Sequence, residues 1–261
     1  MSASFYQPSW SAQFAPDLTV AESTRLGGVS HQPYYSLNLG LYTDDEEVAV
    51  QRNREIFCAA LNWSSDELAG AYQIHEDKVL RVHKPGQWQG YDALMTNKLG
   101  VLLSVTIADC TPVLIYDPVQ QAVGAAHAGW RGTVAQIGRK LLRNMQDAYG
   151  TRSADCWVFI GTCIAADDFE VDADVADHFE APFKRWDASR GKFFVDLKRA
   201  NAHSLYQAGV PEQQVECSTF STVKDNSRYF SHRAEKGLTG RMLAVIGLRE
   251  DLALPLAGKV Y

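Results

Sequence analysis

Paired cysteines, a surplus of positive charge and long apolar runs are all missing from this 261-residue sequence. The five cysteines, at positions 58, 110, 156, 163 and 217, are odd in number and form no Cys-x-x-Cys pair, which is typical of reduced thiols rather than of a disulfide framework. A formal net charge of −6 argues against a nucleic-acid or anionic-membrane surface. These absences favour a protein whose partner is a small molecule.

Targeting and nucleotide-binding signals are missing as well. The first residues, MSASFYQPSWSAQF, lack the basic and apolar segments of a signal peptide, and no run reaches the roughly 18 apolar residues of a membrane helix. The patterns GxxxxGK[ST], GxGxxG after a strand, HExxH and GxSxG do not occur. We therefore expect a cytoplasmic protein that does not enter a membrane.

Strand-like and helix-like segments alternate with short connections, and there is no internal repeat or linker. With 46% hydrophobic residues, the pattern predicts one mixed α/β domain spanning residues 1–261. Helices are expected over 43–61, beginning with a Thr43–Glu46 capping box, and over 131–149, 172–183 and 196–208. Strands are expected over 71–75, 78–82, 91–96, 157–160, 215–223 and 242–248. In the first helix Arg54 lies off the apolar stripe, which is typical of a solvated charge.

The stretch from Val101 to Gly132 is the most informative. Two apolar runs flank Asp117-Pro118-Val119-Gln120, which has the residues of a type I turn. In a hairpin centred on that turn, residues whose numbers total 237 face each other, so Cys110 directly opposes His127. Opposed residues share a face with Cβ atoms about 4.5–5.5 Å apart, whereas a slip of one residue would separate them.

Cys110 and His127, joined by His75, form a candidate three-ligand zinc site. Three protein ligands leave a fourth position open, as in catalytic zinc sites, where the metal lowers the pKa of water to about 7. His83 is the nearest alternative ligand. Taken singly, each residue also has a purely structural interpretation, because a cysteine in an apolar strand usually packs in the core.

A Cys–His hydrolase is a second interpretation of the same residues. Cys110 would then be the nucleophile, a histidine its base, and Asp109 or Asn38 the group that orients the base. The two interpretations differ in whether a metal is bound.

Two further segments could approach a ligand. The start of the helix after His127, with Arg131 beside it, is either an anion subsite or an ordinary structural helix start. The Gly-Gly segment within Ser23–Ser30 is either a close-approach loop or a plain turn.

Several short motifs give the chain a family resemblance. They are TRLGGVS (24–30), LNLG (37–40), NR (53–54), QIH (73–75), DALMT (92–96), ADCTP (108–112), HAGWRG (127–132), FEV (169–171), FSHR (230–233) and TGR (239–241). With these motifs the sequence resembles the multicopper polyphenol oxidase (laccase-domain) family. Bacterial members of that family are described as purine nucleoside phosphorylases or peptidoglycan editing factors.

The resemblance implies a fold and a site. The implied fold is a four-layer α/β/β/α domain with mixed sheets, similar to the catalytic domain of cytotoxic necrotising factor toxins. The metal-binding and catalytic trio of the family corresponds to His75, Cys110 and His127, with zinc, alternatively copper, as cofactor. We predict substrate contacts from Arg25, Ser30, Asn38, Arg54, Gln73, Arg131, Arg233 and Arg241.

The resemblance also implies three functions. The first is phosphorolysis of adenosine, inosine and methylthioadenosine, with deamination of adenosine. The second is an amidase that hydrolyses UDP-N-acetylmuramoyl-L-serine. The third is a metal-binding protein or polyphenol oxidase without efficient nucleoside turnover, although a true multicopper oxidase needs more histidine ligands than these seven histidines provide.

The sequence departs from the family pattern at three positions. Thr162 follows Gly161 where proline is usual, Glu76 follows the first ligand histidine where glycine is usual, and Ala234 replaces an arginine. None of the three is one of the trio, so we expect them to affect pocket shape or substrate choice.

Overall fold

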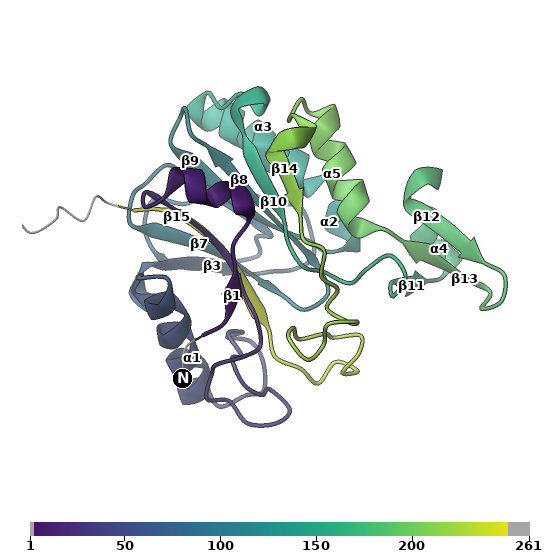
Figure 1. The fold of residues 1–261 in the computed structure, drawn as a ribbon. Coiled ribbons are helices and arrows are strands. Elements are labelled where there is room, and N and C mark those ends of the chain that lie inside the picture. Colours follow the sequence, from purple (N-terminus) through teal and green to yellow (C-terminus); the bar gives the residue numbers. More distant parts are fainter. Residues whose placement is uncertain (1–2, 250–261) are drawn as a thin grey trace, which may run out of the picture.

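Two six-stranded sheets lie face to face in the computed structural model, which describes residues 3–249 (Figure 1). The first sheet has the order β1 (Phe5–Tyr6), β2 (Leu18–Ser23), β15 (Met242–Leu248), β7 (Val101–Ile107), β3 (Leu68–Tyr72), β5 (Gly86–Gln89). The second has the order β14 (Val215–Cys217), β10 (Trp157–Ile160), β8 (Thr111–Asp117), β9 (Ala122–Ala128), β6 (Ala93–Thr96), β4 (Val79–Arg81). Both sheets combine parallel and antiparallel pairs.

Helices cover the two outer faces. Helix α1 (Glu47–Ala60) packs on the first sheet, where Phe57 joins a buried cluster with Leu102 and Leu243. Helices α3 (Ile137–Tyr149) and α5 (Leu197–Gln207) cover the second sheet. The order α/β/β/α, visible from bottom to top in Figure 1, is the predicted layering. The further likeness to the toxin domain stays a prediction.

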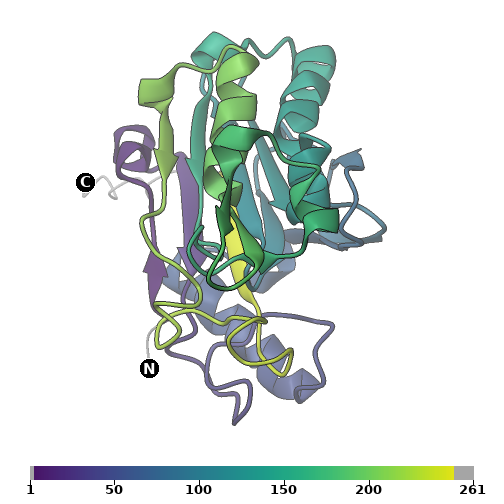
Figure 2. The same ribbon diagram turned by 90° about the vertical axis from the view of Figure 1, so that its right-hand side faces the viewer.

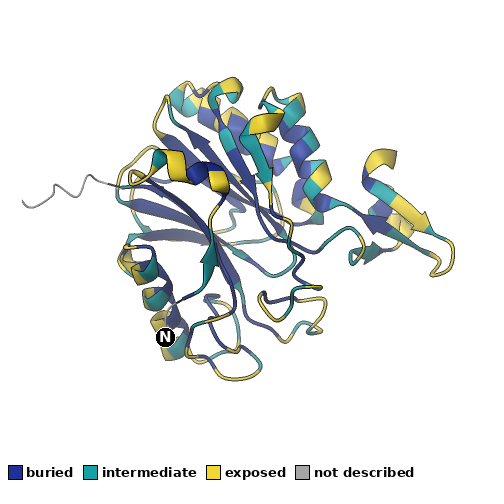
Figure 3. Cartoon of the chain, viewed as in Figure 1, coloured by how far each residue is buried: buried dark blue, intermediate teal, exposed yellow. Residues whose placement is uncertain are grey.

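The central strands β8, β9 and β6 of the second sheet are buried on both faces, which explains their uninterrupted apolar runs. In β8, Val113 and Ile115 pack against the helices, whereas Leu114 and Tyr116 point into the core between the sheets. The dark central strands of Figure 3 show this burial.

A small third sheet projects from one side, at the right of Figure 1. It contains β11 (Glu170–Val171), β13 (Lys192–Val195) and β12 (Lys184–Asp187), with helix α4 (Ala173–Ala176) beside it. The remaining short elements are helix α2 (Trp130–Val134) and the 3₁₀ helices Ser9–Phe14, Ser65–Glu67, Ser153–Asp155, Ala181–Phe183 and Glu212–Gln214.

Two predicted helices differ from the structure, one in its start and one in its continuity. Helix α1 begins at Glu47 without a side-chain cap, because the Thr43 hydroxyl donates to the Gly40 carbonyl and accepts from the Asn38 amide instead. The predicted helix over 131–149 is two helices, α2 and α3, separated by Gln136 in the left-handed region with φ of 57°.

Two other segments have less regular structure than predicted. Within 172–183 only α4 and a 3₁₀ turn are helical, and that turn contains Pro182, which has no N–H for a helical hydrogen bond. Within 215–223 only β14 is extended. Lys198 Nζ donates to the carbonyls of Ser218 and Phe220 and so takes up groups that a longer strand would need.

Two loop regions far apart in sequence lie side by side at one end of the molecule, as both views show (Figure 2). One covers residues 24–46 and the other 218–241, and an ion pair between Arg25 and Glu235 joins them. Among residues 3–249, no helix is both long enough and apolar enough to cross a membrane.

Candidate metal centre and its cavity

His75 lies in the loop after β3 and is held there by a carboxylate. Its backbone has φ of 60°, in the left-handed region. The Asp92 carboxylate accepts hydrogen bonds from three consecutive backbone amides, of Ile74 (3.1 Å), His75 (2.9 Å) and Glu76 (2.9 Å). These bonds satisfy the amides of a tight loop that no strand pairs, and they place the exposed imidazole beside β9.

The same carboxylate fixes His127, near the end of β9. His127 Nδ1 lies 2.9 Å from Asp92 Oδ1, and the His127 amide donates to the Asp92 carbonyl at 2.7 Å. An ionised carboxylate at Nδ1 favours the proton on that nitrogen, so Nε2 is free to bind a metal. His127 is 3% exposed and its ring stands nearly perpendicular to that of His75.

Cys110 lies where the chain crosses from one sheet to the other. Strand β7 ends at Ile107 in the first sheet and β8 begins at Thr111 in the second, with Asp109 in the left-handed region at φ of 89° between them. The apolar run before Asp117 is therefore two strands rather than one arm of a hairpin.

The predicted register of the hairpin is wrong by two. Pro112, not Cys110, is paired with His127, so the numbers of two opposed residues add up to 239 rather than 237. The loop runs over 118–121, with Gln121 in the left-handed region at φ of 48°. Because a shift of two leaves each side chain on its face, Cys110 and His127 still come together.

The ligand atoms of His75, Cys110 and His127 all lie within 4.8 Å of one another. They are the one group of this kind, with three or more His, Cys, Asp or Glu side chains, in the described part of the chain; His83 is not among them. A thiolate with two imidazoles is a donor set that suits zinc and also copper(I). The trio fits the implied metal.

Electrostatics favour a thiolate in the trio. Burial alone would raise the pKa of the Cys110 thiol, but the charge and hydrogen bonds of His127 and His75 outweigh it and lower the pKa to about 6. Burial alone would lower the pKa of His127, yet the Cys110 thiolate and Asp92 raise it to about 9. Without a metal, Cys110 is thus a thiolate beside the imidazolium of His127.

The other four cysteines show the opposite behaviour. Burial raises the pKa of Cys58, Cys156, Cys163 and Cys217. A raised pKa leaves a neutral thiol, which is a poor nucleophile and a poor metal ligand. Cys110 is therefore the reactive thiol of the five.

The trio opens into a cavity of about 590 Å³, within the size range of small-molecule sites. Four aromatic residues from four separate segments of the chain line its walls: Tyr42, Tyr72, Trp130 and Phe169. The other lining residues are Gly40, Leu41, Gln73, Thr106, Ala108, Asp109, Ile164, His232, Arg233 and Arg241. A larger cavity of about 810 Å³ lies beside α5 and contains none of the trio.

Two of the predicted substrate-binding arginines line the cavity. Arg233 donates to the carbonyls of Asp168 (3.5 Å) and Glu170 (3.2 Å). Arg241 Nη1 donates to the carbonyls of Thr239 and Gly240, and its Nε and Nη2 atoms make no hydrogen bond to the described residues. Arg233 therefore uses both of its terminal nitrogens on backbone carbonyls, whereas Arg241 uses only one.

Gln73 also lines the cavity, but its amide is occupied. Its oxygen accepts from the backbone amide (2.7 Å) and the hydroxyl (2.9 Å) of Thr106, and its nitrogen donates to the Thr106 carbonyl (2.9 Å). The side chain ties the His75 loop to β7.

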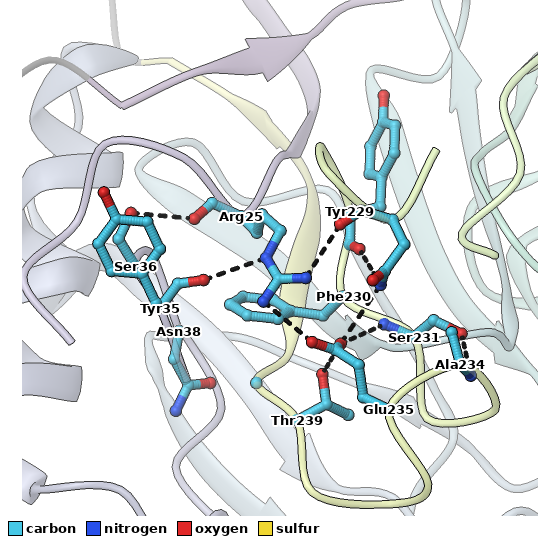
Figure 4. Close-up of polar contacts among 12 residues, drawn as sticks. Arg25, Tyr35, Ser36, Asn38, Tyr229, Phe230, Ser231, Ala234, Glu235 and Thr239 are labelled. Atoms are coloured by element: carbon cyan, nitrogen blue, oxygen red, sulfur yellow. Dashed lines mark hydrogen bonds and ion pairs between the residues drawn. The ribbon is translucent and has the colours of Figure 1, made fainter. Parts of the chain in front are cut away.

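Arg25 lies outside the cavity walls, in a clamp between the two neighbouring loops (Figure 4). Its guanidinium pairs with Glu235 at 3.0 Å, donates to the Tyr35 carbonyl and covers the Phe230 ring at 4.4 Å. Asn38, labelled in the same view, accepts a hydrogen bond from the Arg241 backbone amide through its Oδ1 and so fixes the backbone of that arginine.

Three more predicted contacts also lie outside those walls. Ser30 donates to Asp45. Arg131 is exposed and stacks on the Trp130 ring at 4.3 Å. Arg54 is 5% exposed and donates to the Leu39 carbonyl, so its interpretation as a solvated charge is wrong.

The three departures from the family pattern have distinct surroundings. Glu76 is exposed and pairs with Lys78, while its amide binds Asp92. Ala234 is exposed. Thr162 is buried and donates through both its amide and its hydroxyl to the buried Glu22 carboxylate.

Sequence reasoning did not include Asp92 and His232 in the site. Asp92 could have been suspected as a lone acidic residue at the start of the apolar run 93–95. Asp109, considered only as an orienting group, accepts from the Ser231 hydroxyl (2.7 Å), the Thr222 hydroxyl (2.5 Å) and the Arg233 amide (2.7 Å). It thereby joins the 222–233 loop to the residue before Cys110.

Similar proteins of known name align with nearly the whole of this chain. "Purine nucleoside phosphorylase YlmD" of Bacillus subtilis is 34% identical over 87% of both chains, and "Purine nucleoside phosphorylase" of Deinococcus radiodurans is 41% identical over 90% of this chain and 91% of that one. The crystal structure of YlmD from Geobacillus stearothermophilus has a TM-score of 0.88 at 32% identity, covering 95% of this chain and all of that one.

The family model described as multi-copper polyphenol oxidoreductase laccase matches residues 19–249. This range contains every motif quoted for the resemblance and every residue of the trio. The chain belongs to the multi-copper polyphenol oxidoreductase laccase family.

Proposed function

We propose that this chain is a metal-dependent purine nucleoside phosphorylase that acts on adenosine, inosine and methylthioadenosine and also deaminates adenosine. One observation carries the proposal: the His75–Cys110–His127 trio and the guanidinium groups of Arg233 and Arg241 line one cavity of about 590 Å³. The names of the similar proteins support the same reaction class.

His75, Cys110 and His127 would hold the metal, with zinc as our first choice and copper as the alternative. The metal supplies a Lewis acid beside the substrate when bound. Asp92 orients both histidines through its four hydrogen bonds. Cys110 can be a ligand only as a reduced thiol, and all five cysteines are free, so we place the protein in the cytoplasm.

The arginines are suited to phosphate, and the aromatic walls to the purine. A guanidinium offers paired N–H donors that match phosphate oxygens. Arg241 has Nε and Nη2 without a partner among the described residues, and Arg233 adds a second positive charge to the cavity lining. Trp130 and Phe169 provide flat apolar faces on which a purine ring can stack. Arg131 stacks on Trp130 and helps to hold that ring in place.

Product analysis tests the reaction. Metal-loaded protein is incubated with adenosine, inosine or methylthioadenosine, each with and without phosphate, and in parallel with UDP-N-acetylmuramoyl-L-serine. We expect free base and ribose 1-phosphate (5-methylthioribose 1-phosphate from methylthioadenosine) only when phosphate is present, and inosine from adenosine in its absence. Release of serine-containing product alone would replace the proposal by the amidase, and no turnover with metal retained would replace it by the metal-binding protein.

Metal analysis tests the trio. Cys110→Ala and His127→Ala should each lose bound zinc or copper together with phosphorolysis. Cys217→Ala is the matched control, because Cys217 is an exposed thiol outside the cavity. Unchanged metal content in both trio variants would contradict the assignment of the site.

A further inference from the structure

The proposed phosphorolysis, on which this inference rests, expels a purine base. When the bond between ribose C1′ and purine N9 breaks, its electron pair leaves with the base, which is a poor leaving group unless it takes up a proton. The trio histidines cannot supply that proton once they are metal ligands, and arginine side chains do not give up a proton in proteins. A separate proton donor in the cavity would therefore make the base a better leaving group.

His232 lines the same cavity. Its side chain is exposed, and the ring makes no hydrogen bond to any residue that the structure describes. The ring packs against Gly237, where a Cβ would lie 3.4 Å from His232 Nε2. Gly237 has φ of +88°, so a glycine suits both this conformation and the ring's position.

The backbone of His232 is fixed on both sides. The Ser231 hydroxyl and the Arg233 amide, one residue to either side, both donate to the Asp109 carboxylate at 2.7 Å. The His232 carbonyl accepts from the Gly237 amide at 2.8 Å. Because Asp109 directly precedes Cys110, these bonds tie the His232 loop to the residue next to a metal ligand, and the His232 imidazole lines the cavity that the trio also lines.

The charged and titratable groups around this cavity are few. They are Asp109, Arg233 and Arg241, the trio of His75, Cys110 and His127, and the phenols of Tyr42 and Tyr72. The Asp109 carboxylate is occupied by the backbone and hydroxyl donors of the loop. His232 is therefore the one imidazole in the cavity that is outside the trio.

We propose that His232 is the general acid that protonates purine N7 as the glycosidic bond breaks. An oxygen of HPO₄²⁻ forms the new bond to C1′, the electron pair of the C1′–N9 bond moves into the purine, and the imidazolium proton moves to N7. The sugar phosphate formed still carries the proton of HPO₄²⁻, which it returns to the neutral imidazole. Atoms, charge and protons balance without another reactant.

The test compares two leaving groups in His232→Gln. The base of inosine must gain a proton at N7 as it leaves. The base of 7-methylguanosine already carries a methyl group at N7 and a positive charge, so it leaves without a proton. A general acid contributes about 10²- to 10⁴-fold. We expect kcat/KM for inosine to fall at least 100-fold and that for 7-methylguanosine less than threefold. His31→Gln, an exposed histidine outside the cavity, should change neither.

The pH profile gives a second, independent reading. For wild-type protein and inosine, kcat/KM should fall at alkaline pH, and this limb should be absent in His232→Gln. Equal losses on both nucleosides, no loss on inosine, or an unchanged alkaline limb would each overturn the inference. Absence of phosphorolysis by the wild-type protein would instead overturn the proposed function, and this inference with it.

Discussion

Two buried carboxylates in this molecule behave in opposite ways. Asp92 is 1% exposed and has a lowered pKa, whereas Glu22 is fully buried and has a pKa raised to about 7. Burial pushes both values upward. The difference lies in what surrounds each carboxylate.

Asp92 is surrounded by donors and a cation. Three backbone amides and the His127 ring donate to its two oxygens, and together they outweigh the effect of burial. Glu22 accepts only from the amide and hydroxyl of Thr162, with Lys198 as a weaker charge nearby, and burial dominates. A buried carboxylate therefore stays ionised only where the fold supplies several donors and a positive partner.

Asp92→Ala should have the largest effect, because it leaves the buried His127 ring and three part-buried loop amides without their acceptor. Breaking a buried charge pair costs about 3–5 kcal/mol. We expect a loss of that size in the free energy of unfolding, measured by urea denaturation of the metal-free protein. Asp147→Ala, an exposed acid on α3, is the matched control and should change stability little.

Asp92→Asn separates positioning from stability. Loss of a group that orients a metal ligand costs about 10- to 100-fold in metal affinity. We expect a folded variant with metal affinity reduced by that factor, measured by competition with a chelator. Its cobalt(II) form should show an altered visible spectrum with the thiolate band retained. Wild-type metal affinity in this variant would mean that Asp92 serves only the fold.

Glu22→Gln should remove a pH dependence of stability. Below pH 4.5 the carboxyl is protonated in the folded and unfolded chains; from pH 4.5 to about 7 only the unfolded chain is ionised. The unfolded state then binds fewer protons, so stability falls as pH rises through this window. At 1.36 kcal/mol per unit, the difference in unfolding free energy between variant and wild type should grow by about 3 kcal/mol in favour of the variant.

Urea denaturation of both proteins from pH 4 to pH 8 measures this difference. Subtracting the two curves removes the titration of every group that the proteins share. Parallel curves across the window would show that Glu22 ionises in the folded protein as it does in the unfolded chain.

Local patterns in the sequence were sufficient for the elements with regular periodicity. Strands over 157–160 and 242–248 and the helix from Asp196 to Ala208 are found where predicted, because alternating or helical apolar spacing is a local property. The gathering of the trio was predicted as well, partly from turn chemistry and partly from the resemblance. The two-residue error in register did not separate the ligands because it preserved the side-chain face.

Long-range hydrogen bonding accounts for what the sequence could not give. Arg54 lies off the apolar stripe of its helix, yet the Leu39 carbonyl, from a loop outside the helix, accepts its hydrogen bond and allows its burial. The donors to Asp92 come from residues 74–76 and 127, which no local pattern connects to it. Arg25 lies in a clamp with Glu235, 210 positions later in the chain.

Thr162→Val should have the smallest effect, because it removes only one of the hydrogen-bond donors to Glu22. Valine keeps the shape and the backbone amide of Thr162 but removes the hydroxyl that donates to Glu22 and contacts Ser218. Loss of one such hydrogen bond costs about 1 kcal/mol. Because hydrogen bonds from Thr162 lower the Glu22 pKa, their partial loss should raise it further and extend the pH-dependent fall in stability above pH 7. The same urea series measures both effects. When Thr162→Val is combined with Glu22→Gln, the shift in the pH dependence of stability should disappear while a loss of stability remains. A shift that persists in the double variant would show that Thr162 acts through another group.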